Sequence, residues 1–488
     1  MATEPVTDAA APAAAPAAAA QDHPAAGPGQ LAAAFHPHTL SLASRAVHAD
    51  DYINTHRAVA PPLHVSTTYR YSRDPVALRQ WENHDPNAPF DSHIYARDSA
   101  PNTTRLEAVL TALLGAPSLT YASGLAAFHA LIVFLNPRRV AIDVGYHGCH
   151  GVLALMHKVN GLQKLDLASE ADVAQLRPGD VVHVETPLNP TGEARDLAYY
   201  ARLAHDRGCY LTVDATFGPP PLQDPFAWGA DVVLHSGTKY FGGHSDMLCG
   251  VLAVNPAHTY VVDHAATDAA TAVTPAAAAA AATDDPTKKD WIAGLRSERL
   301  LLGSVMGSLE GWLGVRSLRT LELRVTRQST NAAHLVAWLA AASAQPGTLV
   351  ARIVERVHHA SLQPEAADPD SWLRKQMPRG FGPVFAIVLR DEHLARRLPS
   401  KLELFHHATS LGGVESLIEW RYMTDRSVDR RLLRISVGVE GWEDLKADLK
   451  RAFAALAAGI DDTAAATAGA VAADSATNGK AARGPVPA

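Results

Sequence analysis

Short apolar runs alternate with amphipathic stretches through most of the chain. Five runs rich in Val, Ile and Leu predict strands at residues 139–144, 180–186, 209–216, 231–237 and 248–254. Apolar residues at helical spacing predict helices at residues 104–115, 123–135 and 196–208. Strands that are apolar along their whole length, with helices between them, are typical of a mostly parallel sheet covered on both faces. The pattern therefore predicts an α/β fold.

Three alanine-rich segments flank or interrupt this pattern. They hold too few bulky apolar side chains to offset the entropy of ordering, and they lie at residues 1–35, about 263–287 and 458–488. We expect the first and last to be disordered tails and the middle one to be a surface-loop insertion. The rest is predicted to form an N-terminal arm at 36–100, a large domain at 101–300 and a smaller α+β domain at 301–457. A long amphipathic stretch at 302–339 is expected to bridge the two domains.

The composition excludes several classes of function. The 488 residues carry a formal net charge of −7, so no basic surface for nucleic acid or membrane is expected. A membrane-spanning helix would need about 18 consecutive apolar residues, and no stretch approaches this. The chain also lacks the glycine-rich motifs of dinucleotide-binding and triphosphate-binding enzymes. Three cysteines cannot form a disulfide framework in a chain of this size, so we expect a soluble, cytoplasmic protein.

Polar residues stand where the predicted strands end. Asn189, Asp214 and Lys239 each end or follow one of the apolar runs, and Ser123 with Gly124 starts a predicted helix. Ligands bind at the carboxyl ends of the strands in parallel sheets, so these residues should share one edge. A buried ion pair between Asp214 and Lys239 is one interpretation, because a buried acid needs a partner. A cofactor site is the other.

The cofactor interpretation accounts for more of the residues. Pyridoxal 5'-phosphate needs an amine for covalent attachment, an acid beside its ring nitrogen and a donor-rich cradle for its phosphate. Lys239 and Asp214 supply the amine and the acid. Ser123 opens a helix, whose N-terminus attracts phosphate, and Ser236 and Thr238 add hydroxyl donors beside the lysine. The sequence therefore predicts a pyridoxal phosphate site.

Over about residues 45–455 the chain resembles the Cys/Met-metabolism (trans-sulfuration) enzymes, which use pyridoxal phosphate on the fold-type-I scaffold. Five motifs in the family's order carry the resemblance: YASGLAA, ETPLNPTG, VDATF, HSGTKYFGGHSD, and SLGGVESLIEW with LLRISVGVE. The alanine-rich insertion and the variant HSGTKYFGGHSDMLCG look most like a fungal branch similar to cystathionine γ-synthases. The resemblance implies a mostly parallel sheet with helices on both faces and a smaller α+β C-terminal domain.

The resemblance also implies a role for each residue that matches a family motif. Lys239 would hold the cofactor covalently and then shuttle protons, and Asp214 would pair with the ring nitrogen. Arg434 would clamp the α-carboxylate of an amino-acid substrate, with Ser410 nearby. The other matching residues are Tyr146 for ring stacking and catalysis, Asn189 for the phenolic oxygen and the substrate, Thr216 for the cofactor, Ser123, Gly124, Leu125, Ser236 and Thr238 for the phosphate, and Tyr95 (also catalytic) and Arg97 for the phosphate of a neighbouring subunit. Active sites shared in this way would make the protein a homodimer or homotetramer.

Enzymes of the family differ in the bond that they break. In β-elimination the leaving group departs directly after loss of the α-proton, whereas in γ-chemistry a second proton leaves Cβ and the γ-substituent is expelled. The sequence SLGG at 410–413 resembles γ-acting enzymes, because some β-lyases carry Trp after the serine. We therefore expect γ-replacement on an O-acylhomoserine by cysteine or another nucleophile, as in a cystathionine γ-synthase. Cystathionine β-lyase or γ-lyase activity is the alternative, and a catalytically inactive binding protein is a remoter one.

Two local features receive structural interpretations. The segment HGCH at 147–150 lacks the spacing of a zinc site and has no second pair of ligands, so no metal site is predicted. Gly237 stands where the resembled family has alanine, and we expect this glycine only to loosen the backbone.

Overall fold

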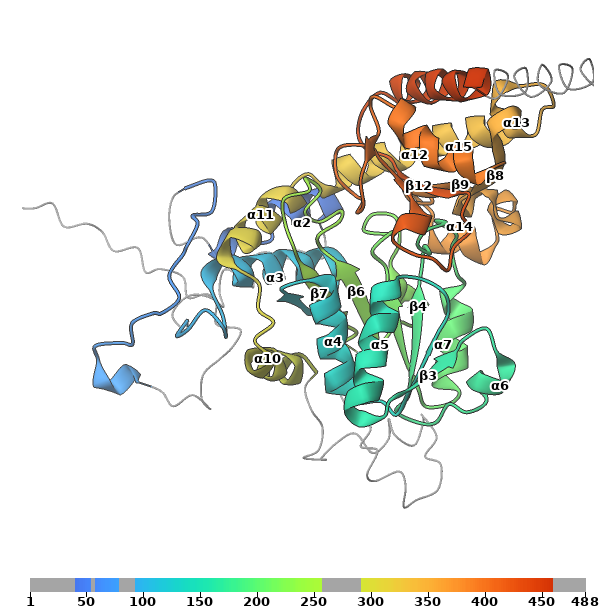
Figure 1. Cartoon of the computed structure of the whole chain (residues 1–488). Helices are drawn as coiled ribbons and strands as arrows, with labels where there is room; N and C mark the ends of the chain where they lie inside the picture. Colours follow the sequence, from blue (N-terminus) through green and yellow to red (C-terminus); the bar gives the residue numbers. More distant parts are fainter. Residues whose placement is uncertain (1–39, 54–57, 79–92, 257–290, 460–488) are drawn as a thin grey trace, which may run out of the picture.

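The computed structural model describes residues 40–53, 58–78, 93–256 and 291–459 (Figure 1). The predicted tail at 1–35 and the predicted insertion at 263–287 lie outside these ranges, as does nearly all of the predicted tail at 458–488. Within the described ranges, every helix is too short or too polar to cross a membrane.

A seven-stranded sheet forms the first half of the structure, with the strand order β1-β7-β6-β5-β4-β2-β3. The bounds are β1 Ser118–Tyr121, β2 Arg139–Ile142, β3 Gln163–Asp166, β4 Val181–Glu185, β5 Tyr210–Asp214, β6 Val232–Ser236 and β7 Gly250–Val254. Neighbouring strands from β6 to β3 are parallel, whereas β7 is antiparallel to both β6 and β1. The prediction of a mostly parallel sheet is thus confirmed, because β7 alone runs against the other strands.

Helices cover both faces of this sheet because successive residues on its strands are apolar. On β6, Val232 packs into a core with α4 (Gly124–Leu135), whereas Val233 packs into another core with α7 (Leu197–His205). The other helices of this half are α2 Leu42–His48, α3 Pro101–Leu114, α5 His147–Asn160, α6 Glu170–Val173 and α10 Trp291–Leu302. The continuous apolar runs of the sequence correspond to strands buried on both sides.

A second, mixed sheet follows, with the strand order β10-β11-β12-β9-β8. Its bounds are β8 Val354–His358, β9 Val384–Leu389, β10 His406–His407, β11 Leu417–Trp420 and β12 Leu432–Ser436. Its core includes side chains of α12 (Leu321–Ser343) and of the helix at 442–459. Shorter helices connect these elements: α13 Leu349–Ile353, α14 Trp372–Gln376 and α15 Glu392–Arg397. The smaller α+β unit predicted at the C-terminal end has this architecture.

The predicted long stretch at 302–339 is two helices, α11 (Ser308–Leu318) and α12. A turn separates them, in which the N–H of Thr320 donates to the carbonyl oxygen of Ser317 (3.2 Å). The turn leaves Leu318 and Leu321 buried in the same core. The chain therefore breaks into two helices here, although its helical pattern is continuous, and the break leaves both leucines buried.

The two sheets meet at the turn that follows β4. Gly192 in this turn has a φ of +73°, and a Cβ at this position would collide with the carbonyl oxygen of Val384 on β9. Glycine alone permits so close an approach at this backbone angle. The N–H of Ala360 also donates to the carbonyl oxygen of Gly192 (3.0 Å). The turn after β4 is therefore held by both halves of the structure.

The segment at 58–78 is extended and has few buried side chains (Figure 1). Val59 and Val76 are each more than nine-tenths exposed, and the single short helical turn of this segment is η3 (Pro75–Ala77). A bridge between Thr68 and Tyr95 attaches the segment to the chain that precedes α3. The arm expected at residues 36–100 stays a prediction.

Candidate functional site

Three polar side chains end neighbouring strands of the large sheet. Glu185 ends β4, Asp214 ends β5 and Ser236 ends β6, and Glu185 lies beside Asp214 in the strand register. The carboxylate of Asp214 is buried and accepts a hydrogen bond from the N–H of Thr216 (3.0 Å). Burial raises the pKa of Asp214, because the charged form loses its water. A buried acid of this kind favours a cationic group beside it.

Lys239 lies in the turn after β6, and its amine donates to the hydroxyl of Ser410 (2.7 Å). Burial and the positive charge of Arg434 lower the pKa of Lys239 to about 8, while Glu419 and Asp214 act in the opposite direction. Among the described residues no ion pair joins the amine to the carboxylate of Asp214, although the two interact electrostatically. The structure thus differs from the buried ion pair considered above, because the amine bonds to Ser410 instead.

The start of α4 touches the end of β6. The hydroxyl of Ser123 caps the helix and accepts a hydrogen bond from the N–H of Ala126 (3.1 Å). A Cβ on Gly124 would lie 3.1 Å from the Cβ of Ser236, which places the helix start against the strand end. The first N–H groups of a helix, here including that of Leu125, have no partner within the helix and attract anions. These groups and Ser236 form a cradle suited to a phosphate.

Two threonines predicted to hold the cofactor bond to the backbone around it. The hydroxyl of Thr216 accepts from the N–H of Ser236 (2.8 Å), and that of Thr238 accepts from the N–H of Cys249 (3.0 Å). A Cβ on Gly237 would lie 2.6 Å from the sulfur of Cys249 and 2.9 Å from its Cβ. The expectation that Gly237 only loosens the backbone is therefore wrong. An alanine here would overlap the side chain of Cys249.

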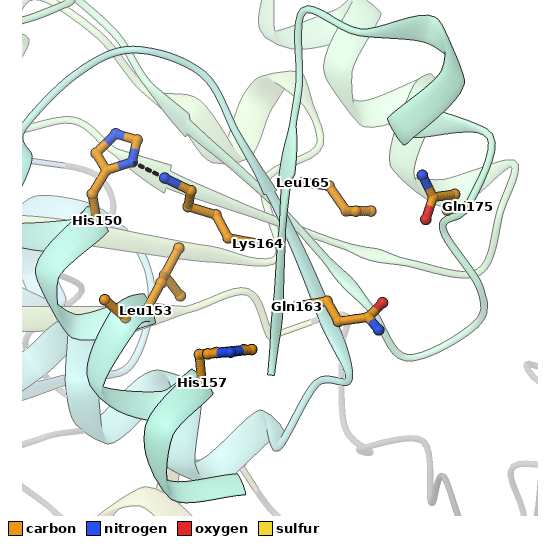
Figure 2. A pocket seen from close by; sticks show the side chains of 8 residues that line it. His150, Leu153, His157, Gln163, Lys164, Leu165 and Gln175 are labelled. Carbon is orange, nitrogen blue, oxygen red and sulfur yellow. Dashed lines mark hydrogen bonds between the residues drawn. The ribbon is translucent and has the colours of Figure 1, made fainter. Parts of the chain in front are cut away.

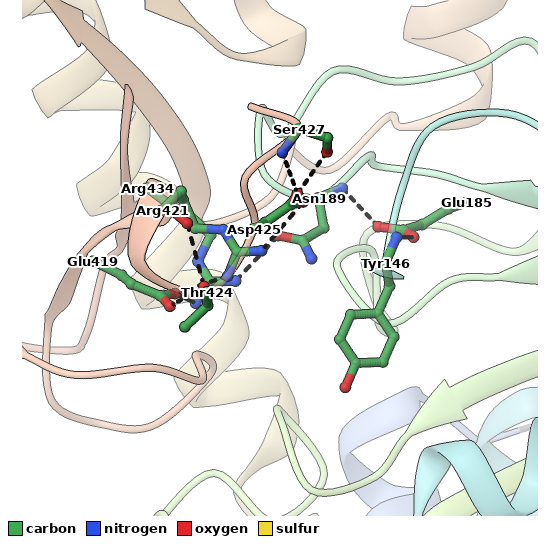
Figure 3. A network of polar contacts seen from close by, with 9 residues as sticks. All are labelled: Tyr146, Glu185, Asn189, Glu419, Arg421, Thr424, Asp425, Ser427 and Arg434. Carbon is green, nitrogen blue, oxygen red and sulfur yellow. Dashed lines mark hydrogen bonds and ion pairs between the residues drawn. The ribbon is translucent and has the colours of Figure 1, made fainter. Parts of the chain in front are cut away.

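Glu185 joins the two loops that carry Tyr146 and Asn189 (Figure 3). Its Oε2 accepts from the N–H of Tyr146 (2.7 Å) and its Oε1 from the N–H of Asn189 (2.6 Å). Burial and the negative charge of Asp214 raise the pKa of Glu185. Tyr146 is 36% exposed, and its ring lies 4.9 Å from that of His147 between centroids. Glu185 was not predicted from the sequence, although it ends an apolar strand as Asp214 does.

Arg434 on β12 reaches the same edge from the second sheet. Its Nη1 donates to the side-chain oxygen of Asn189 (3.1 Å) and its Nη2 to the carbonyl oxygen of Ser410 (2.8 Å). The same Nη2 pairs with the carboxylate of Glu419 (2.5 Å), which also accepts from Arg421 (3.0 Å). Glu419 and Arg421 were not predicted, because the pattern along one strand does not reveal its partners on the next. The structure thus brings Lys239, Asn189, Ser410 and Arg434 into one cluster.

Tyr95 and Arg97 make other contacts within the protomer. Tyr95 is 45% exposed and pairs with Thr68 in an isolated bridge. The guanidinium of Arg97 lies over the ring of Tyr95 (5.5 Å to the centroid) and donates to the carbonyl oxygen of Leu300 (3.4 Å). Among the described residues, no hydrogen bond or ring contact joins either of them to Lys239.

The residues at the strand ends fit pyridoxal phosphate in three respects. The amine of Lys239 has a lowered pKa, which favours covalent attachment of an aldehyde. The carboxylate of Asp214 is buried without an ion pair among the described residues and would accept a hydrogen bond from the protonated ring nitrogen. The start of α4 would hold the phosphate. Tyr146 would lie on the ring, and Asn189 would contact its phenolic oxygen.

A separate hollow lies between α5 and β3 (Figure 2). It is lined by polar side chains that include His150, His157, Gln163, Lys164 and Gln175. None of the predicted site residues lines it. Within the described ranges, no group of three or more His, Cys, Asp or Glu side chains is arranged to hold a metal ion. We therefore place the candidate active site at the strand ends.

The chain is similar to known enzymes over most of its length. Residues 43–454 match the family model for Cys/Met metabolism PLP-dependent enzymes. The chain is 32% identical to cystathionine γ-synthase of Escherichia coli over 421 residues, which cover 81% of this chain and 93% of that protein. It is 29% identical to cystathionine β-lyase of Lactococcus lactis over 416 residues, which cover 81% of this chain and 94% of that protein. The crystal structure of cystathionine γ-lyase from yeast matches with a TM-score of 0.68 and 26% identity, covering 85% of this chain and 98% of that chain.

Proposed function

The chain belongs to the family of Cys/Met metabolism PLP-dependent enzymes, and on this basis we propose that it catalyses γ-replacement as a cystathionine γ-synthase does. The substrate would be an O-acylhomoserine, and the nucleophile would be cysteine or another small molecule. Two hydrogen bonds carry the proposal: the amine of Lys239 donates to the hydroxyl of Ser410 (2.7 Å), and Arg434 donates to the carbonyl oxygen of Ser410 (2.8 Å). They set a proton-transferring amine beside a cationic clamp for the substrate carboxylate.

Pyridoxal phosphate, when bound, supplies an electron sink for the negative charge that develops at the α-carbon of the substrate. Lys239, with a pKa of about 8, can exchange protons near neutral pH and would accept the α-proton. Asp214 would keep the ring nitrogen protonated through its negative charge. Arg434 would hold the α-carboxylate and so turn the α-hydrogen toward the amine.

The preference for γ-chemistry rests on the turn that follows Ser410. In this turn Leu411 stands where some β-lyases carry Trp. Gly412 has a φ of +84°, and a Cβ at this position would lie 2.9 Å from the carbonyl carbon of Lys239. The turn therefore packs directly against the segment that bears the amine. Relatives that are named synthases and lyases have similar identity to this chain, so the turn supports the preference and the relatives do not.

A product assay tests the proposal. Purified holoenzyme would be given O-acetylhomoserine, O-succinylhomoserine or cystathionine, each with and without cysteine. Cystathionine, 2-oxobutanoate and pyruvate would be measured separately. We expect an O-acylhomoserine and cysteine to yield cystathionine. Pyruvate as the main product from cystathionine would instead identify a β-lyase, and 2-oxobutanoate from cystathionine would identify a γ-lyase.

The remoter alternative, an inactive binding protein, is tested by the colour of the holoenzyme. Cofactor attached to Lys239 should absorb visible light, and this band should disappear in the Lys239→Ala variant or after borohydride treatment. A preparation that stays colourless with added cofactor would favour the binding protein.

We further propose that two or four copies of the chain share their active sites. Tyr95 and Arg97 would contact the phosphate bound by a neighbouring subunit, since within one protomer they contact Thr68 and Leu300. The exposed arm that bears Val59 and Val76 would lie against that neighbour. The division at residue 300, the resemblance to a fungal branch and the cytoplasmic location stay predictions.

A further inference from the structure

Two buried arginines, Arg421 and the proposed substrate clamp Arg434, share the carboxylate of Glu419 (Figure 3). Glu419 on β11 lies directly opposite Arg434 on β12 in the strand register, and its Oε2 accepts from Arg434 (2.5 Å). The same oxygen accepts from Arg421 (3.0 Å), and Oε1 accepts from the hydroxyl of Thr424 (2.9 Å). Glu419, Arg421 and Arg434 each expose less than 5% of their surface. The group is thus a desolvated triad with one negative and two positive charges.

Because the triad is buried, water screens the interactions between its charges only weakly. Burial lowers the pKa of Arg434 to about 10, Glu419 acts against this effect and Arg421 adds to it. Arg434 therefore stays charged at neutral pH, beside a negative and a positive neighbour. Asp425 lies at the limit of contact with Arg421 (4.0 Å) and accepts hydrogen bonds from the N–H and the hydroxyl of Ser427.

A clamp for a carboxylate needs a net positive charge as well as the correct geometry. If Arg434 were paired with Glu419 alone, the pair would be neutral, and Glu419 would repel an incoming carboxylate. Arg421 donates to the same oxygen at 3.0 Å, whereas its other acid, Asp425, lies 4.0 Å away, so Glu419, Arg421 and Arg434 together have a net charge of +1. Arg421 also acts electrostatically on Tyr146 and Glu185, which places its charge within reach of the active site.

We propose that Glu419 and Arg421 are positioning residues for the α-carboxylate of the substrate. Glu419 orients the guanidinium of Arg434, and Arg421 supplies the positive charge that Glu419 would otherwise cancel. The inference rests on the proposed function, because it requires Arg434 to bind an amino acid. The two residues act through Arg434 and do not touch the reacting atoms.

The test compares two ligands that differ only in the carboxylate, L-alanine and ethylamine. Neither has a γ-substituent to lose, and binding to the holoenzyme is measured from the change in visible absorbance of the cofactor. In Arg421→Met, the dissociation constant for alanine should rise about tenfold, the size of effect that one nearby unit charge has in a partly screened site. The constant for ethylamine should stay unchanged. Arg421→Lys, which keeps the charge, should bind alanine within about threefold of wild type.

The double variant Glu419→Gln with Arg421→Met separates a charge effect from a packing effect. It returns the net charge to +1, so its affinity for alanine should recover most of what Arg421→Met loses. Arg431→Met, which removes a partly exposed arginine next to β12 that pairs with Glu355, is the matched control and should change neither affinity. Melting temperatures of all variants report folding independently.

Three results would overturn the inference. Arg421→Met could bind alanine as wild type does, it could lose alanine and ethylamine equally, or the double variant could show no recovery. A wild-type enzyme that binds alanine no more tightly than ethylamine would refute the carboxylate clamp itself, and with it the proposed function.

Discussion

The amine of Lys239 lies 2.7 Å from the hydroxyl of Ser410, although 171 residues separate the two in sequence. Lys239 follows a strand of the large sheet, and Ser410 precedes a strand of the second sheet. Ser410 has a φ of +78°, a left-handed conformation that costs a non-glycine residue energy. The N–H of Gly412 donates to the hydroxyl of Ser436 (3.1 Å), which helps to hold this turn in place. The position of the reactive amine is thus fixed by both sheets together.

The Ser410→Ala variant should therefore affect the pKa of the Lys239 amine more than the stability of the fold. The hydroxyl accepts from the charged amine, so its loss should lower the pKa of Lys239 further and reduce turnover about tenfold, the size of one buried hydrogen bond. Turnover against pH measures both effects. Ser400→Ala, which removes an exposed hydroxyl that donates to the carbonyl oxygen of Arg397, is the control. An unchanged pH profile in Ser410→Ala would contradict this expectation.

The lowered pKa of Lys239 predicts how cofactor uptake depends on pH. Attachment of an aldehyde requires the neutral amine, and the neutral fraction grows as pH rises through the pKa. The rate at which apoenzyme takes up pyridoxal phosphate should therefore rise as pH increases through about 8 and level off above it. Stopped-flow absorbance measures this rate. A rate that still rises steeply near pH 10 would mean that the pKa of Lys239 is not lowered.

The Asp214→Asn variant should weaken cofactor binding. An amide can still accept a hydrogen bond but cannot balance the charge of a protonated ring nitrogen, so the dissociation constant should rise about 10- to 100-fold, the range for a hydrogen bond to a charged group. Fluorescence titration of apoenzyme with pyridoxal phosphate measures it. Asp206→Asn, on the exposed end of α7, is the control. Equal affinity in Asp214→Asn and wild type would place the ring nitrogen elsewhere.

The Glu185→Gln variant should loosen the two loops that meet at its carboxylate. An amide has one acceptor oxygen, so either the bond to Tyr146 or the bond to Asn189 is lost, and the visible circular dichroism of bound cofactor should change. The raised pKa of Glu185 gives a second readout. The folded apoenzyme keeps a proton that the unfolded chain releases, so its stability should fall as pH rises above 4.5, the usual pKa of a glutamate. Melting temperatures across this range should depend less on pH in Glu185→Gln, and an equal dependence in both proteins would contradict the assignment.

The Arg97→Ala variant tests the shared site. We expect it to bind pyridoxal phosphate more weakly, by about tenfold for a lost charged hydrogen bond, without unfolding the protomer. Arg202→Ala, an exposed arginine on α7, should leave the affinity unchanged. Titration with pyridoxal phosphate measures the affinity of both variants, and circular dichroism checks that both are folded. Wild-type affinity in Arg97→Ala would count against a site built by two subunits.

Local patterns in the sequence predicted much of the large sheet and the residues at its edge. The apolar runs identified β2 and β4 to β7, and a polar residue after each run pointed to Asn189, Asp214 and Lys239. The strands β1 and β3 were missed, since SLTY and QKLD are short and more polar than the runs that identified the other strands. The reversed direction of β7 was also missed, because an apolar run has the same pattern in either direction.

The contacts between distant segments could not be predicted in this way. Glu419 and Arg434 form a pair only because β11 and β12 take one particular register, and Gly237 is required only because Cys249 lies beside it. Ser410 was expected near the substrate carboxylate through a family resemblance, and its hydrogen bond to Lys239 depends on how the two sheets meet. Such contacts depend on how distant segments pack, and the pattern of a single sequence says little about that packing.

The order of these residues along the chain bears on its synthesis by the ribosome. The last strand of the large sheet ends at Val254, and Lys239 has been translated by then. The turn that contains Ser410 and the strand that contains Arg434 emerge much later. In a nascent chain Lys239 is thus present before Ser410 and Arg434, the residues proposed to hold its amine and to bind the substrate. Under these proposed roles, selectivity for an amino acid begins only after Arg434 has been made.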